Sequence, residues 1–166
     1  PVPFQLAGPE AVAQALGQAG VGDGMTAVLY DDTASLYAGR VWWSLQAYGF
    51  ESARILDGGW PAWLASGRPV SSAAGTAVET ATFTPRMEPR RVLSTGDVRA
   101  LLGSHEVDLV DVREPAEYRG QGGNAVRLGH IPGAVNVPAT LLSTPGEQGF
   151  RDADATGRLF TDAGLQ

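Results

Sequence analysis

The sequence predicts an α/β fold in which an open, mostly parallel sheet has helices on both faces. Short apolar runs alternate with amphipathic helical patterns, which is the spacing of parallel strands joined by right-handed crossovers. The chain has 166 residues, 43% of them hydrophobic, enough for one domain or for pieces of two. A stretch rich in Pro, Ser, Ala, Thr and Gly separates two blocks. Neither block has all the elements of a complete domain, so we expect two incomplete domains joined by a linker.

The first block begins with a helix pattern. Pro and an early carboxylate suit the start of a helix, and Gly suits its end. The expected elements are a helix from Gly8-Pro9-Glu10 to Gly20, a buried strand at Thr26–Tyr30, a helix at Leu36–Tyr48, a second buried strand at Ala53–Leu56, and a short helix at Pro61–Ser66. We expect the second helix to bury a face that carries Leu36, Trp43 and Ala47, widened by Val41, Leu45 and Tyr48.

The composition changes over residues 67–90, which have no apolar period and read as a linker with one edge strand at Ala81–Thr84. The second block starts at Ser94, which forms a capping-box pattern with Asp97. Its expected elements are a helix to Leu102, a strand at Val107–Val110, a short helix at Pro115–Tyr118, a strand at Ala134–Val137, and a helical turn near Thr156–Phe160. The two blocks could combine into one sheet or keep separate half-sheets, and the linker composition favours separate ones.

Composition excludes several classes of function. The formal net charge is −6 and lysine is absent, which argues against nucleic-acid binding, a lysine-containing phosphate loop and Schiff-base chemistry. Cysteine is also absent, so the chain has no disulfide, thiolate–metal site or cysteine nucleophile. His105 and His130 lack metal-ligand spacing, and no apolar run is long enough for a membrane helix. The start, Pro-Val-Pro-Phe, reads as the interior of a longer protein.

The segment VLYDDTASLYAGRVWW, residues 28–43, has the strand–loop–helix pattern at which α/β enzymes often hold an anion or a nucleophile. Asp31 follows the strand directly. It is therefore either a catalytic carboxylate or the occupant of a site whose chemistry has been lost. The second interpretation makes Asp31 an anion that fills its own binding site and caps the helix.

Two motifs in the second block carry further candidates. In LVDVREPAEYRG, residues 109–120, Asp111 ends a strand and Arg113 follows. This pair could anchor an anion, but its spacing alone favours a structural salt bridge. In GHIPGAVNVP, residues 129–138, His130 precedes a Pro-Gly turn. Because no nucleophile lies near it in the sequence, we interpret His130 as a hydrogen-bonding residue of the loop.

LVDVREPAEYRG followed by GHIPGAVNVP resembles the opening half of a rhodanese-like domain. RVWWSLQAYGFESARILDGGWPAWLASGRPV, residues 40–70, resembles the closing half of a preceding one. This order is similar to that of tandem-domain sulfurtransferases of the thiosulfate or 3-mercaptopyruvate type. The resemblance implies that residues 1–70 end an inactive first domain, 71–92 link the domains, and 93–166 begin the second domain without its catalytic loop.

The resemblance also implies the chemistry. A cysteine of the second domain takes sulfane sulfur from thiosulfate or 3-mercaptopyruvate as a persulfide and passes it to a thiol or cyanide. The partners would thus be a small anionic donor and a small acceptor, with no cofactor, metal, nucleic acid or membrane. The cysteine would lie beyond Gln166, so this Cys-free chain is predicted to be inactive alone. The lack of cysteine and of a signal segment favours a cytoplasmic location.

The family's functional residues map onto this sequence one by one. Asp31 matches the cysteine position in the inactive first domain. Asp111, Arg113 and His130 match residues that support the active site. Glu117 stands where several members have a substrate-anchoring arginine, and Arg119 or Arg127 could serve instead.

Three other interpretations stay open. A rhodanese-like domain without cysteine can be a non-catalytic regulatory or binding module. A phosphatase or arsenate reductase can share the fold, with a longer cysteine loop for a larger oxyanion. An unrelated nucleotide-binding α/β domain is disfavoured because a Gly-rich phosphate turn is missing.

Overall fold

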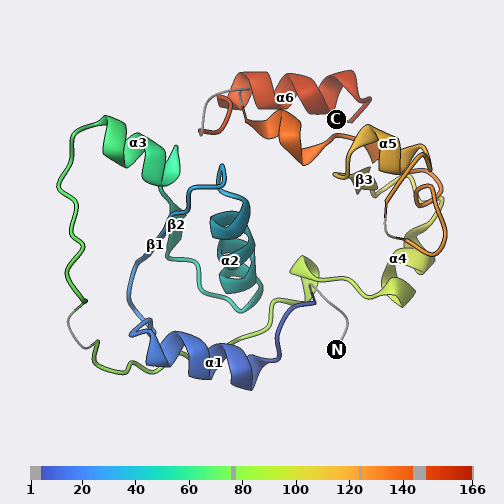
Figure 1. Cartoon of the computed structure of the whole chain (residues 1–166). Helices are drawn as coiled ribbons and strands as arrows, with labels where there is room; N and C mark the ends of the chain where they lie inside the picture. Colours follow the sequence, from blue (N-terminus) through green and yellow to red (C-terminus); the bar gives the residue numbers. More distant parts are fainter. Residues whose placement is uncertain (1–4, 76–77, 124, 144–148, 166) are drawn as a thin grey trace. The chain divides into compact units, whose positions relative to one another are not determined.

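A computed structural model describes residues 5–75, 78–123, 125–143 and 149–165. The chain divides into two compact units, Pro1–Val92 and Leu93–Gln166 (Figure 1). In the described residues each unit has its own two-stranded sheet, which confirms the expectation of separate half-sheets. Gln166 lies outside the described residues.

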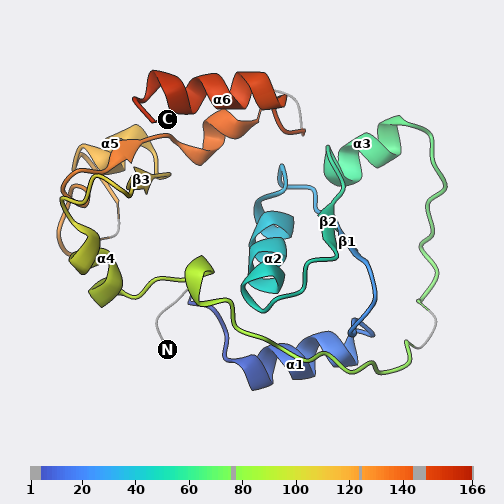
Figure 2. The same cartoon turned by 180° about the vertical axis from the view of Figure 1, so that it is seen from behind.

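The first unit follows the predicted order of elements. These are α1 (Pro9–Gln18), β1 (Ala27–Leu29), α2 (Leu36–Ala47), β2 (Ala53–Ile55), α3 (Gly59–Ala65) and the 3-10 helix η1 (Pro89–Arg91). Strands β1 and β2 pair in parallel, with Ala27 opposite Ala53 and Leu29 opposite Ile55. The predicted crossover is confirmed, since α2 joins the two strands and packs against both (Figures 1 and 2).

The buried face of α2 differs from the predicted one. Ala38, Leu45, Ala47 and Tyr48 are buried, whereas Leu36 is 66% exposed and Val41 is 41% exposed, so the placement of these two residues on the buried face was wrong. Apolar residues lie on several sides of this helix, so their spacing alone does not show which side is buried. The core that forms here consists of Leu45, Tyr48, Phe50, Ala53 and Phe83.

The prediction that both strands of the first unit are buried was also wrong in part. Val28 is 60% exposed and Tyr30 is 58% exposed. Alternate residues of a strand point to opposite faces. Ala27 and Leu29 pack against the core, so Val28 lies on the opposite face. Val28 and Tyr30 border an apolar groove with Trp60 and Trp63.

Part of the expected linker belongs to the first unit. Phe83 is 5% exposed and lies in the core, and residues 78–92 fall within this unit. The edge strand expected at Ala81–Thr84 does not form. These residues instead bond to α1 and to the turn after it, where no neighbouring strand offers a ladder of partners.

The second unit contains α4 (Thr95–Leu101), β3 (Val110–Asp111), α5 (Pro115–Tyr118), β4 (Val135–Asn136), the 3-10 helix η2 (Ala139–Leu142) and α6 (Ala153–Asp162). The capping box of Ser94 and Asp97 is confirmed. Strands β3 and β4 are parallel, with Asp111 opposite Asn136. Only the end of the expected strand at Val107–Val110 is paired, and the expected turn near Thr156–Phe160 is part of a longer helix.

Within the residues described, no helix is both long and apolar enough to cross a membrane.

Candidate functional site

The loop between β1 and α2 is organised around the carboxylate of Asp31. Its Oδ1 accepts hydrogen bonds from the N–H groups of Thr33 (3.0 Å) and Ser35 (2.9 Å), and its Oδ2 from those of Tyr37 and Ala38 (both 2.8 Å). Tyr37 and Ala38 belong to the first turn of α2, whose N–H groups have no partner within the helix. Asp31 therefore caps the helix, a role that the side chain of Ser35 at the N-cap position does not perform.

The electrostatics of Asp31 follow from these bonds. Burial raises the pKa of its carboxyl, but hydrogen bonds from the N–H groups of Ala38, Thr33 and Ser35 outweigh burial and hold the pKa below its usual value. Asp31 is thus ionised at neutral pH. A carboxylate has about four lone-pair positions, and the four N–H groups take them up, so this side chain is poorly suited to attack a substrate.

The main chain of Asp31 is fixed from the other side by α3. The N–H of Trp60 donates to Asp31 O at 2.8 Å. A Cβ at Gly59 would lie 2.3 Å from the same oxygen, so only glycine allows this approach. The rings of Tyr30 and Trp60 stack at 6.1 Å beside it. The end of β1 and the start of α3 therefore hold the loop in place.

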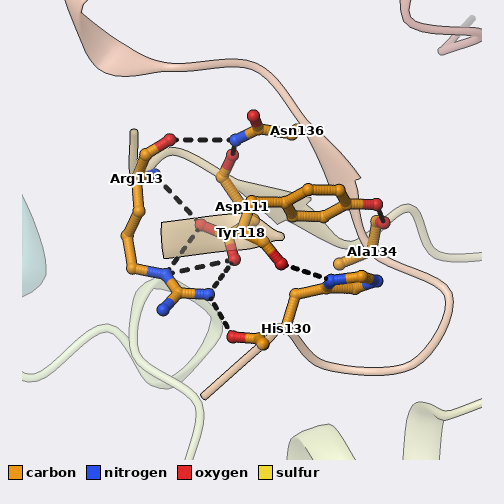
Figure 3. A network of polar contacts seen from close by, with 7 residues as sticks. Asp111, Arg113, Tyr118, His130, Ala134 and Asn136 are labelled. Carbon is orange, nitrogen blue, oxygen red and sulfur yellow. Dashed lines mark hydrogen bonds and ion pairs between the residues drawn. The ribbon is translucent and has the colours of Figure 1, made fainter. Parts of the chain in front are cut away.

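The second candidate site lies at the end of β3, where Asp111 and Arg113 form an ion pair (Figure 3). Arg113 Nε is 3.0 and 3.1 Å from the two carboxylate oxygens, and the backbone N–H of Arg113 donates to Oδ1 at 3.0 Å. Arg113 Nη2 bonds to the same carboxylate and donates to Gly129 O at 2.9 Å. The pair thereby ties the end of β3 to the loop that precedes β4.

Three further side chains complete this network. Asn136 Nδ2 donates to Asp111 O (2.8 Å) and Arg113 O (2.9 Å), and Tyr118 donates its hydroxyl hydrogen to Ala134 O (2.8 Å). His130 Nδ1 lies 2.8 Å from Tyr118 O, and the two rings stack at 3.8 Å (Figure 3). Because a carbonyl only accepts, we assign the hydrogen to Nδ1. The loop with His130 is thus held to α5 and β3.

The ion pair also sets the charge state of its members. The hydrogen bond from Arg113 holds the pKa of Asp111 below its usual value, and the same bond raises the pKa of Arg113. The Asp111 side chain is 10% exposed and that of Arg113 is 38% exposed. A permanently charged pair of this kind suits positioning better than proton transfer.

The structure brings together some of the predicted site residues and not others. Asp111, Arg113, His130 and Arg127 line one open groove of the second unit. Arg119 is exposed and bonds through its Nε to Gln121 Oε1 at 3.3 Å. It is Arg127, of the two candidate arginines, that joins the groove.

Tyr118 and Asn136 were missed as site residues. Both stand inside the motifs LVDVREPAEYRG and GHIPGAVNVP, so the motifs themselves were the available signal. In the described part of the chain, no group of three or more His, Cys, Asp or Glu residues could hold a metal ion.

Comparison with known proteins identifies the class of this chain. The model of the rhodanese-like domain family matches residues 5–66 and again residues 94–161. The chain therefore belongs to the rhodanese-like domain family, and the predicted fold class is confirmed.

Curated relatives within this family that resemble the chain are named as sulfurtransferases. The chain is 34% identical to human 3-mercaptopyruvate sulfurtransferase over 88% of its length, and 32% identical to the enzyme of that name from Escherichia coli K12 over 99%. It is 30% identical to putative thiosulfate sulfurtransferase 1 of Mycobacterium bovis, also over 99%. These alignments span 51%, 59% and 61% of the relatives, so the chain corresponds to little more than half of each.

Solved structures with a similar fold include two from this comparison. The crystal structure of the Escherichia coli 3-mercaptopyruvate sulfotransferase SseA matches all of this chain and 62% of its own, with a TM-score of 0.88 and 29% identity. YnjE matches 93% of this chain and 40% of its own, with a TM-score of 0.81. Its identity is 24%, so that likeness shows the fold alone.

Proposed function

We propose that this chain is part of a tandem-domain sulfurtransferase that moves sulfane sulfur from thiosulfate or 3-mercaptopyruvate to a thiol or cyanide. One observation carries the proposal: sulfurtransferases named for these two donors align with 88–99% of the chain at 30–34% identity. The sulfur would travel as a persulfide on a cysteine that these 166 residues do not contain.

The proposal assigns a role to each part of the chain. Residues 1–70 form the end of a first domain that does not react, 71–92 connect the domains, and 93–166 begin the second, catalytic domain. In the first domain, Asp31 stands in place of the thiol. The N–H groups of Tyr37 and Ala38, which donate to Asp31, support this replacement of a thiol by a carboxylate. N–H groups at the start of a helix also stabilise a thiolate.

In the second domain, the Asp111–Arg113 pair and His130 would form one wall of the active site. Hydrogen bonds of Arg113 and His130 hold the loops that border this open groove. Arg127 would attract the anionic sulfur donor, since its side chain lines the same groove as Arg113. The acceptor would enter from solvent.

The test compares two purified proteins. The 166-residue chain should form no thiocyanate from thiosulfate and cyanide above a blank, and no pyruvate from 3-mercaptopyruvate. The protein that continues past Gln166 through the expected cysteine loop should form one or both products. Activity of the 166-residue chain, or inactivity of a longer protein that contains the cysteine, would contradict the proposal.

Within the longer protein, the two arginines provide a matched pair. Arg127→Ala should raise KM for the anionic donor about tenfold, which corresponds to the loss of about 1.4 kcal/mol from one charged contact. Arg119→Ala should leave KM unchanged. The reverse result would move the anchor to Arg119.

A non-catalytic regulatory or binding module is the competing function. It predicts that the sequence after Gln166 has no cysteine in a strand–loop–helix pattern, whereas the sulfurtransferase requires one. Cell fractionation would test the predicted cytoplasmic location.

A further inference from the structure

Glu117 belongs to α5 and packs against the loop that follows this helix. Its side chain is half-buried. A Cβ at Gly123 would lie 2.8 Å from Glu117 Oε1 and 3.5 Å from its Cδ, so the carboxylate lies directly on the backbone of Gly123. Gly123 has a φ of 103°, a conformation that residues with a side chain rarely adopt. Glycine therefore both permits this turn and leaves the space that the carboxylate occupies.

This arrangement keeps the negative charge of Glu117 near Arg113. The hydrogen bond to Asp111 is the main reason that the pKa of Arg113 is raised, and the charge of Glu117 raises this pKa further. Among the described residues, Glu117 forms no direct ion pair with Arg113. Its influence acts through space, so it lowers the positive potential at Arg113 without occupying the hydrogen-bond donors of the guanidinium.

The charges around the groove of the second unit nearly cancel. Asp111, Arg113 and Arg127 line the groove, and the first two offset one another as an ion pair. In the part of the chain that the structure describes, Arg127 has no carboxylate within ion-pair distance. With His130 counted as neutral, the charge of Glu117 balances that of Arg127. The groove thus offers one cationic side chain in surroundings with no net charge.

This balance matters because the two candidate donors differ in charge. Thiosulfate carries two negative charges, whereas 3-mercaptopyruvate carries the single charge of its carboxylate. Taking an anion out of water costs more free energy as its charge rises, and only nearby positive charge offsets that cost. A second negative charge in this groove would find no further cation and would be repelled by Glu117.

We propose that Glu117 determines specificity, by making the groove select a singly charged carboxylate donor such as 3-mercaptopyruvate over doubly charged thiosulfate. The inference rests on the proposed function, because it takes this groove to be the place where the donor binds. Glu117 has no part in the chemical step. It changes only the electrostatic energy of the bound anion, which is proportional to the charge of that anion.

Anion binding to the 166-residue chain tests this selectivity. The chain has no cysteine, so thiosulfate can bind without reacting, and pyruvate represents the keto acid part of 3-mercaptopyruvate. Dissociation constants are measured by NMR at neutral pH and fixed ionic strength, from the amide signals of Val112, Gly129 and Ile131, which line the groove. The native chain should bind pyruvate more tightly than thiosulfate. Tighter binding of thiosulfate would contradict the proposal.

Glu117→Gln keeps the shape of the side chain and removes its charge. It should strengthen binding of pyruvate about threefold and of thiosulfate about tenfold, because doubling the charge of the anion doubles the change in binding free energy. The difference between these two factors is the evidence for selection by charge. Equal factors, no change, or no binding of either anion to either protein would overturn the proposal.

Glu114→Gln is the matched control. It also removes one negative charge from the same segment, but this carboxylate faces Thr140, whose hydroxyl donates to Glu114 Oε1 at 3.0 Å. Both dissociation constants should stay as in the native chain. Gains as large as those of Glu117→Gln would show that only the net charge of the chain matters, and the assignment to Glu117 would be wrong.

The binding result can be separated from the outcome for the proposed function. An inactive longer protein, together with the expected binding factors, would contradict the sulfurtransferase alone. An active longer protein in which Glu117→Gln changes kcat/KM for both donors by the same factor would contradict the selectivity alone.

Discussion

Asp31 lies two residues after β1 and Asp111 is the last residue of β3, but their carboxylates have different kinds of hydrogen-bond partner. Asp31 accepts from backbone N–H groups of its own loop and of the next helix. Asp111 is paired with the side chain of Arg113, which reaches on to Gly129 O. The first arrangement closes a local anion site, whereas the second connects separate loops. A carboxylate near the end of a strand can therefore either organise its own loop or join two separate loops.

Removing the carboxylate of the first unit should have the largest effect. Asp31→Ala leaves four N–H groups without their acceptor and should lower the free energy of unfolding by about 2 kcal/mol, the upper end of the range for a helix cap. All four tryptophans, Trp42, Trp43, Trp60 and Trp63, belong to the first unit, so their fluorescence in urea reports on it. An unchanged midpoint would mean that the bonds to Asp31 contribute little. Asp31→Asn, which keeps one acceptor oxygen, should lie in between.

Placing a thiol in the same loop tests what the N–H groups can hold. Asp31→Cys introduces the one cysteine of the chain, and its pKa should fall below that of a free thiol, giving about tenfold more thiolate at pH 7. The rate of alkylation against pH measures this shift. Thr26→Cys, at an exposed position of the same unit outside this loop, serves as the control with an ordinary pKa. Sulfur uptake from thiosulfate by Asp31→Cys would show that the loop still has the geometry that sulfur transfer needs. An unshifted pKa of the introduced thiol would show that it does not.

Breaking the ion pair of the second unit should cost less. Asp111→Ala should destabilise the second unit by about 1 kcal/mol, because Arg113 stays partly solvated after its partner is lost. Exchange should become faster at the amides of Val135 and Val137, which bond to Leu109 O and Asp111 O. Tryptophan fluorescence should not respond. A shift of the tryptophan transition would show that the two units are not independent.

Tyr118→Phe isolates a single bond of the network. It removes the hydroxyl that donates to Ala134 O and keeps the ring that stacks on His130, so we expect a loss of about 0.5 kcal/mol. The ring-current shift of the His130 protons should persist in the NMR spectrum. Its disappearance would mean that the hydroxyl, not the stacking, orients His130.

The smallest change is expected on varying pH near neutrality. The folded-state pKa values of Asp31 and Asp111 are both lowered, so each contributes stability that is fully present above the unfolded value of about 3.9. This stability is lost as the pH falls through the folded values. Urea midpoints should therefore be flat from pH 6 to 8 and fall below about pH 4, and Asp31→Ala should show a weaker acid dependence of the first unit. A midpoint that rises on acidification would reverse this sign.

Local signals in the sequence predicted the elements well. The capping box at Ser94 depends only on neighbouring residues, and it forms as expected. Burial was harder, because an apolar run such as that of Val28 and Tyr30 does not say which face is covered. Asn136 and Tyr118 escaped notice because their partners lie 16 to 25 residues away. Composition could not show that residues 78–88 pack on the first unit, because it reflects the free chain and not the core in which Phe83 is buried.

Ala34 and Ser35, in the loop around Asp31, both have positive φ, at 53° and 65°. A side chain makes this left-handed backbone unfavourable by roughly 1–2 kcal/mol per residue, and glycine would adopt it freely. The loop is therefore not the shape that its own residues prefer. The hydrogen bonds to the Asp31 carboxylate hold the loop in this conformation. The curvature of the loop therefore depends on the negative charge of that side chain.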